Sequence, residues 1–171
     1  TVKTKGLVFG RNKKEGMEVE VAVDADFAND LDRRQSIAGL MAFVGGQLIK
    51  WSCKNPKDKC AVADSVAMAE MHALHYGAVT AIGIGRVVAE FGHPPRKAIK
   101  VYEDCAPTIK WTEGVYEGNR HMDVKYHYTR HEVDKGTIEV VKIPSDDNSA
   151  DMQPKPLGPK PLERHCRVFL G

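Results

Sequence analysis

The sequence lacks the features that would place it at once in a specialised class of protein. Its 171 residues include only 4 cysteines, and 25 basic residues barely exceed 23 acidic ones, which gives a formal net charge of +2. No apolar run of about 18 residues is free of charges and helix-breaking residues, which excludes a membrane-spanning helix. A net charge this small gives no argument for a nucleic-acid partner. Composition therefore excludes a membrane span and identifies no partner.

The cysteines indicate neither a disulfide framework nor a zinc site. A chain of this length can bury a hydrophobic core without crosslinks, and only Cys53 and Cys60 lie close together in the sequence. No second pair of Cys or His residues at short spacing completes a zinc site. The chain begins at Thr1, and its first residues lack the apolar stretch of a secretory signal. We therefore expect reduced thiols and an intracellular, not secreted, protein.

What is present is an ordinary globular composition, with 42% apolar and 28% charged residues. At about 100 to 200 residues per domain, the length predicts a single domain with a tail. We expect a lead-in segment over residues 1–16, one domain over 17–152, and a proline-rich spacer with a short C-terminal helix over 153–171. The prolines at 154, 156, 159 and 161 make the spacer stiff and extended.

Hydrophobic periodicity predicts an α/β fold. Alternation from Met17 predicts a strand that ends in acids at 24 and 26, the polar segment 29–35 predicts a turn, and two apolar runs joined at Gly45 and Gly46 predict a hairpin. An Ala-, Met- and Leu-rich stretch from Val66 to Phe91, after a plausible cap at Asp64 or Ser65, predicts a long helix. The remaining predicted elements are a strand over 98–104, helices near 107–111 and over 119–134, a strand over 137–143, and a closing helix capped within 145–151. This order predicts a mixed sheet with helices on its faces.

Four carboxylates occupy unusual positions in this pattern. Asp24 follows an apolar stretch of a strand, and Glu70 lies in the helix stripe that should face the sheet. Asp104 joins a strand to a helix, where open α/β sheets form ligand crevices, and Asp151 stands in the first turn of the closing helix. Simpler roles exist for Asp24 as a solvated strand end, for Asp104 as an N-cap and for Asp151 as a favourable charge at a helix N-terminus. A buried Glu70, however, needs a cation, and its own helix offers no obvious lysine.

Taken together, the four acids favour a site for hard divalent cations. Oxygen ligands from separate elements suit Mg²⁺ or Mn²⁺ better than zinc. Two such ions, held about 3.5 to 4 Å apart, can activate a water molecule and stabilise the leaving oxygen of a phosphodiester. Phosphoryl chemistry is therefore the reaction class that the acids favour.

Several ordered blocks of the sequence resemble the ribonuclease H domain at the end of the polyprotein of copia-type LTR retrotransposons, and they cover nearly the whole chain. The blocks are DADFANDLDRRQSIAG, FVGGQLIKWSCK, the region around Ala69 and Glu70, VYEDCAPTIKW, NRHMDVKYHYTRHEV and SADMQPKPL. The resemblance implies a ribonuclease H-like fold over 17–152, with a five-stranded mixed sheet of three antiparallel strands and then parallel strands, flanked by helices.

The resemblance also implies a function. Members of this family are metal-dependent endonucleases that hydrolyse the RNA strand of RNA/DNA hybrids with two Mg²⁺ or Mn²⁺ ions. They need no organic cofactor and do not act at a membrane. Their metal-binding carboxylates match Asp24, Glu70, Asp104 and Asp151. Asp24 and Asp104 would hold ions near the scissile phosphate, and Asp151 would complete the second ion's coordination. Glu70 would anchor one ion and meet the ribose 2′-hydroxyl, with Asp26 accessory. The implied partner is an adjacent reverse transcriptase domain, in a cytoplasmic virus-like particle or the nucleus.

Departures from the family pattern leave an alternative open. The stretch 66–70 reads VAMAE where the family usually has Thr-Thr-Glu-Ala-Glu, and Asp104 is followed by Cys105 and Ala106 instead of Asn and Gln. Hydroxyls and amides suited to nucleic acid are therefore missing. The alternative is a diverged or domesticated non-catalytic module that serves as a structural or nucleic-acid-binding component of a larger assembly.

Two other groups of residues favour packing or solvation over function. The spacing of His121, His127 and His131 is irregular for zinc, so we expect these side chains to be solvated or packed. Trp51 in the predicted hairpin is expected in the core rather than on the surface as a base-stacking platform.

Overall fold

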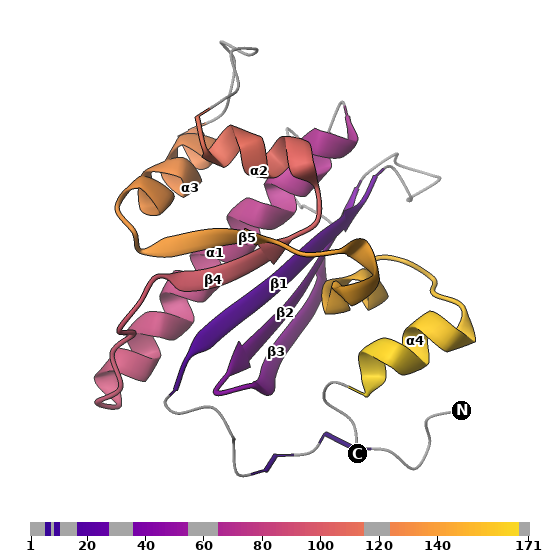
Figure 1. The fold of residues 1–171 in the computed structure, drawn as a ribbon, viewed down its shortest axis with the longest axis horizontal. Helices are drawn as coiled ribbons and strands as arrows, with labels where there is room; N and C mark the ends of the chain where they lie inside the picture. The colour runs from indigo at the N-terminus through magenta and orange to yellow at the C-terminus, as the bar shows by residue number, and fades with distance from the viewer. Residues whose placement is uncertain are drawn as a thin grey trace.

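The structure, a computed structural model, describes residues 6–7, 9–10, 17–27, 36–54, 65–114 and 124–167. Five strands form one sheet, and helices cover it on both sides (Figure 1). The strands are β1 (Val19–Asp26), β2 (Ile37–Val44), β3 (Gln47–Lys54), β4 (Ile99–Glu103) and β5 (Ile138–Lys142). The helices are α1 (Val66–Glu90), α2 (Ala106–Thr112), α3 (Val124–Asp134) and α4 (Pro159–Cys166), and the 3₁₀ turns are η1 (Ser145–Asp147) and η2 (Ser149–Met152).

The sheet has the spatial order β3-β2-β1-β4-β5. β1 and β3 pair antiparallel with β2, whereas β4 pairs parallel with both β1 and β5. Gly45 and Gly46 form the tight turn between β2 and β3 with φ angles of 57° and 76°, which is the left-handed conformation that two-residue hairpins favour. The predicted sheet, three antiparallel strands followed by parallel ones, is therefore confirmed.

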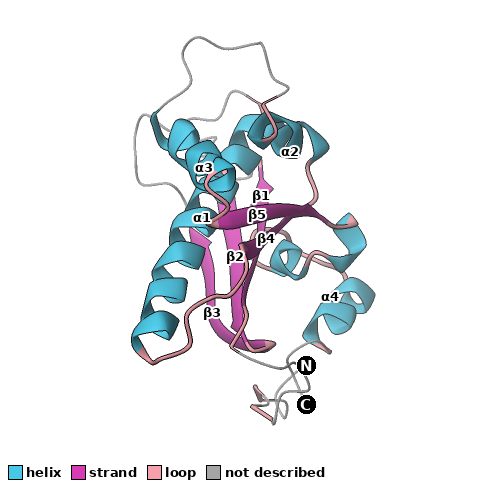
Figure 2. Cartoon of the chain, turned by 60° about the vertical axis from the view of Figure 1, so that its left-hand side comes forward, coloured by secondary structure: helices cyan, strands magenta, loops and turns pink. Residues whose placement is uncertain are grey.

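Helix α1 builds the core by covering one face of the sheet. The Ser65 hydroxyl accepts a hydrogen bond from the Met68 N–H and begins the helix, as the sequence predicted. The alanines and leucine of its inner face pack against alternate residues of β1, β2 and β4, among them Val21, Leu40 and Val101, which are all fully buried. α3 lies beside α1, whereas η2 and α4 lie on the opposite side of the sheet (Figure 2).

The segment after β5 differs from the prediction. Instead of one closing helix, the chain forms the two short turns η1 and η2, because the Asn148 side chain accepts the N–H of Ala150 and Pro154 soon removes a backbone donor. The expected extended spacer is short as well. α4 begins at Pro159, where a missing N–H costs nothing in the first turn of a helix.

The structure also tests several sequence predictions that concern single residues. The expectation for Trp51 is wrong: it is 55% exposed, because it lies on the edge strand β3. His127 and His131 are exposed, in line with a solvated role. The described cysteines are free thiols. No helix in the described ranges combines the length and the apolar character needed to cross a membrane. The predicted turn at 29–35, His121 and most of the lead-in segment lie outside the described residues.

Candidate metal centre

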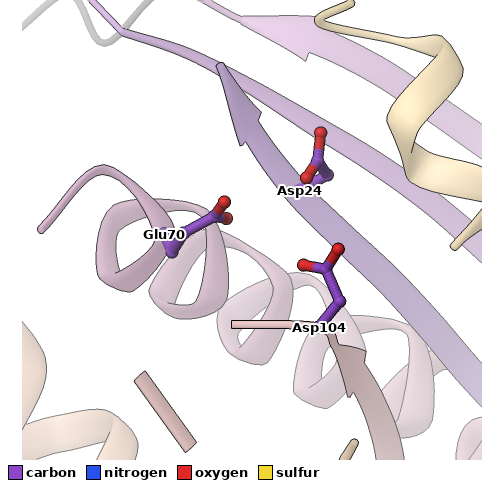
Figure 3. A group of neighbouring side chains, drawn as sticks. All are labelled: Asp24, Glu70 and Asp104. Atoms are coloured by element: carbon purple, nitrogen blue, oxygen red, sulfur yellow. The ribbon is translucent and has the colours of Figure 1, made fainter. Parts of the chain in front are cut away.

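Three of the four predicted acids meet at one end of the sheet. Asp24 lies near the carboxyl end of β1, and Asp104 directly follows the parallel neighbour β4, so both side chains reach the same edge. Glu70 reaches this edge from the second turn of α1. Figure 3 shows the three carboxylates pointing toward a common space. One oxygen from each of the three lies within 4.8 Å of the others.

Because two of its carboxylates are buried, this cluster is energetically unfavourable in the absence of a cation. Asp24 is fully buried and Glu70 is 5% exposed, whereas Asp104 is half-buried. Asp24 Oδ2 and Glu70 Oε2 are buried and have no hydrogen-bond partner within the described residues. Buried polar atoms almost always find a partner, and an all-oxygen donor set suits Mg²⁺ or Mn²⁺. The residues present therefore fit a hard divalent cation.

The pKa values of the clustered carboxyl groups also indicate a cation site. Burial, reinforced by the nearby negative charges of Glu103, Asp24 and Asp104, raises the pKa of Glu70 to about 10. Burial also raises the pKa of Asp24 to about 7, although a hydrogen bond from Lys155 pulls it down. Both shifts arise chiefly because burial disfavours the charged form of a carboxylate, and the positive charge nearby is too small to offset it. A divalent ion would supply that charge and restore the ionised forms.

Glu103, which is not among the predicted site residues, adds a further negative charge beside the three acids. It is fully buried at the end of β4, and its Oε1 accepts hydrogen bonds from the N–H groups of Asp104 and Cys105, at 3.1 and 3.0 Å. Burial raises its pKa to about 8, against the lowering effect of these hydrogen bonds. Glu103 thus fixes the backbone that carries Asp104. The sequence held a signal for it, since Ile99, Val101 and Glu103 alternate on one face of the strand.

Asp151 lies beside Asp24 but is not among the three converging acids. It lies in η2, and Lys155 links it to Asp24: Lys155 Nζ donates to Asp24 Oδ1 and to Asp151 Oδ1, each at 2.9 Å. Although burial alone would lower the pKa of Lys155, its hydrogen bonds to Asp151 and Asp24 raise that pKa above the ordinary lysine value. The raised pKa of Asp24 favours a protonated carboxyl group, whereas the raised pKa of Lys155 favours a charged ammonium group. We take the pair as a charged ammonium with ionised partners, because one nitrogen donates to both carboxylates.

Lys155 falls in the predicted spacer and is not among the predicted site residues. The available signal was its position four residues after Asp151. Asn148 fixes this region by donating from Nδ2 to the carbonyl oxygen of Val23, at 2.8 Å. η2 is therefore fastened to β1 one residue before Asp24. Asp26 is half-buried and is not among the three converging acids.

A surface hollow of about 620 Å³ lies away from these residues. It is lined by residues 17–20 and 92–100, near the amino ends of β1 and β4, whereas the carboxylates lie at the carboxyl ends. None of the clustered acids lines it. We therefore place the candidate chemistry at the carboxylate cluster.

Comparison with solved structures identifies the fold. LC11-RNase H1, whose structure was determined in complex with an RNA/DNA hybrid, matches with a TM-score of 0.57 and 15% identity over 80% of this chain and 93% of that chain. The N-terminal RNase H domain of rv2228c from Mycobacterium tuberculosis matches with a TM-score of 0.55 and 12% identity, over 89% of this chain and 98% of that chain. The chain therefore has the ribonuclease H fold.

Comparison of sequences identifies its homologues. These are retrovirus-related Pol polyproteins from plant transposons. The chain is 32% identical over 150 residues to the polyprotein from transposon TNT 1-94 of Nicotiana tabacum, and the match covers 86% of the chain and 11% of the polyprotein. The polyprotein from transposon RE2 of Arabidopsis thaliana is 29% identical over 139 residues, which is 78% of the chain and 9% of the polyprotein.

The chain thus spans about a tenth of the length of these relatives. No family model matches it. The ribonuclease H fold and the relationship to Pol polyproteins, both predicted from the sequence blocks, are confirmed.

Proposed function

We propose that this chain is an endonuclease that hydrolyses the RNA strand of RNA/DNA hybrids with two Mg²⁺ or Mn²⁺ ions. The observation that carries the proposal is the convergence of Asp24, Glu70 and Asp104, with buried oxygens that have no partner in the described part of the chain. The fold supports a nuclease of this kind, and LC11-RNase H1, which shares it, was captured with an RNA/DNA hybrid.

The positions of the acids suggest how the ions would be held. Asp24, Glu70 and Asp104 would hold one ion, and Asp24 and Asp151 would hold the other. Bound ions of this kind supply an activated water and neutralise charge on the phosphate. Glu70 would also meet the ribose 2′-hydroxyl of the RNA strand. Glu103 would keep Asp104 in place through its hydrogen bonds to the backbone.

Charge explains why a polyanion would need the ions in order to approach this edge. Asp24, Glu70, Glu103 and Asp104 form a negative cluster, and Lys155 offsets only part of it. The chain as a whole carries a net charge of only +2. Divalent ions would reverse the local sign where the phosphate has to sit. Additional contacts with the hybrid would come from an adjacent reverse transcriptase domain, which we propose as the partner. We place this assembly inside the cell, in a cytoplasmic particle or the nucleus.

The test is cleavage of a labelled RNA/DNA duplex by the purified chain. We expect cutting of the RNA strand with Mg²⁺ or Mn²⁺ and none with a chelator. Asp104→Asn should lower the rate at least about 100-fold, which is typical for loss of a group that acts in the transition state. Asp134→Asn, at an exposed acid of α3, is the matched control and should cut like the wild type. Absence of cutting by the intact chain, or equal cutting by Asp104→Asn, would contradict the proposal.

A second candidate, a non-catalytic nucleic-acid-binding module, is favoured by the loop after β4. Cys105 stands at the N-cap of α2 without a side-chain capping hydrogen bond, and neither it nor Ala106 offers the side-chain amide that would contact a nucleic acid. This candidate predicts binding of the hybrid that depends steeply on salt but not on divalent ions. Measuring hybrid affinity with Mg²⁺ and with a chelator separates the two functions.

A further inference from the structure

Lys155 occupies the part of the carboxylate cluster that a second cation would need. We propose that Lys155 is an internal cation of the metal centre, and that a second divalent ion binds between Asp24 and Asp151 only by displacing its ammonium group. The inference rests on the proposed function, because it requires that these carboxylates hold divalent ions. It goes further by assigning an order of binding to the two ions.

The contacts divide the centre into two unequal halves. On one side, a single Nζ atom donates to both Asp24 Oδ1 and Asp151 Oδ1, so this half already has a positive charge. On the other side, Asp24 Oδ2 and Glu70 Oε2 are buried without a partner in the ranges that the structure describes. The uncompensated half should attract the first ion. The compensated half presents the next ion with a like charge at close range.

The position of Lys155 is built into the fold. Asp24 pairs with Gly39 across β1 and β2, and the chain around Pro154 lies directly over Gly39. A Cβ atom at Gly39 would stand 2.6 Å from Pro154 Cδ and 2.8 Å from the Ala150 carbonyl oxygen. The Lys155 N–H also donates to the carbonyl oxygen of Asp151, at 3.2 Å. The backbone of Lys155 is therefore held next to Asp24.

The side chain of Lys155, in contrast to its backbone, has room to leave. It is 35% exposed, whereas the Asp24 side chain is completely buried. Four rotatable carbons let an ammonium swing into water while its Cα stays fixed. Displacement by a second ion therefore needs no rearrangement of the sheet, and it costs only the two hydrogen bonds of Nζ.

Calorimetric titration of the intact, metal-free chain with Mn²⁺ tests the inference. We expect two binding events of different affinity in the wild type. Lys155→Met should strengthen the weaker event roughly tenfold, within the usual range of coupling between sites, and leave the stronger event unchanged. Lys160→Met, at an exposed lysine of α4, removes the same charge and should bind like the wild type. Two ions that bind the wild type equally, or a second event that Lys155→Met leaves unchanged or weakens, would overturn the inference.

A measurement on the unaltered chain covers the case in which Lys155→Met does not fold. The rate at which acetic anhydride modifies each lysine is followed by peptide mass spectrometry, with and without saturating Mg²⁺. Displacement should raise the rate at Lys155 several-fold and leave Lys160 unchanged, whereas an unchanged or lower rate at Lys155 overturns the inference. If the wild type binds no ion at all, the proposed function fails too, whereas two ions bound without any effect at Lys155 overturn only this inference.

Discussion

Gly77 in α1 lies directly against Val23 in β1, and the contact leaves no room for a methyl group between them: a Cβ atom at Gly77 would collide with Val23 Cγ1. Val23 immediately precedes Asp24, and Gly77 follows Glu70 by about two helical turns on the same face. The close approach of α1 to β1 therefore sets how near Glu70 comes to Asp24. A glycine outside the carboxylate cluster thus fixes its geometry.

Replacing this glycine should separate the helix from the sheet. Gly77→Ala is expected to lower the free energy of unfolding by about 1 to 3 kcal/mol, because Val23 is β-branched and cannot turn aside. Chemical denaturation measures the change. Gly83→Ala is the matched control in the same helix, where a Cβ would meet nothing within 4 Å. It should raise stability by about 0.5 to 1 kcal/mol, since alanine is the better helix former. Equal effects at the two positions would show that the contact with Val23 does not limit the packing.

Divalent ions should stabilise the folded chain. At an ion concentration about 100 times the dissociation constant, binding adds about 2.7 kcal/mol, which corresponds to roughly 5 to 10 °C in Tm for a chain of this size. Differential scanning fluorimetry with Mn²⁺ or a chelator measures the shift. Asp104→Asn should reduce the shift because it removes a carboxylate from the cluster, and Asp134→Asn should keep it. A shift of equal size in Asp104→Asn would place the ion elsewhere.

The pH dependence of stability without metal should have an unusual sign for acidic groups. The pKa values of Glu103 and Glu70 are both raised from 4.5, to about 8 and about 10, chiefly by burial. The folded state therefore binds protons more tightly than the unfolded state. Their stabilising contribution is fully present below about pH 4 and is lost as the pH rises through the folded-state values. We expect the Tm of the metal-free chain to fall between about pH 5 and pH 9.

A neutral replacement isolates this effect. Glu103→Gln keeps an oxygen that can accept the N–H groups of Asp104 and Cys105, but it cannot ionise. The decline of Tm with pH should therefore be shallower in Glu103→Gln than in the wild type. Glu90→Gln, at the exposed end of α1, should leave the slope unchanged. A slope unaltered by Glu103→Gln would mean that its carboxyl group does not titrate in this range.

Loss of Asn148 should loosen η2 and the groups that it carries. Asn148 is fully buried and joins η2 to the Val23 carbonyl through its side chain. Asn148→Ala leaves that carbonyl without its donor, and we expect a cost of about 1 to 3 kcal/mol. Ser145→Ala, three residues earlier at an exposed position, should change stability little. Urea denaturation of both variants measures the difference, and a similar small cost in both would show that the Asn148 contact contributes little.

Much of the fold was predictable because its signals are local. Alternation marks β1, two glycines mark the hairpin, and the Ser65 cap with the apolar stripe marks α1. Asp24 and Asp104 were predictable for a related reason, since the ends of neighbouring parallel strands meet at one edge. These features depend on residues that lie close together in the sequence or on general rules of sheet topology.

The rest depended on contacts between distant segments, which no local pattern records. Lys155 reaches Asp24 across 131 positions of the chain, and only the packing of Pro154 over Gly39 brings it there. Trp51 is apolar enough for a core, but its place on an edge strand leaves it exposed. The prediction of a closing helix was wrong for a local reason. The Asn148 side chain competes for backbone hydrogen bonds, which the residue pattern does not record.

The carboxylates of the cluster come from β1, α1 and the end of β4, and η2 adds Asp151 from far along the chain. Such a centre exists only after the sheet, α1 and the C-terminal segment have all assembled. An ion that binds it would therefore stabilise the native state more than the folding transition state. Bound metal should accordingly give the native state kinetic stability, because it should slow unfolding and leave the rate of folding nearly unchanged.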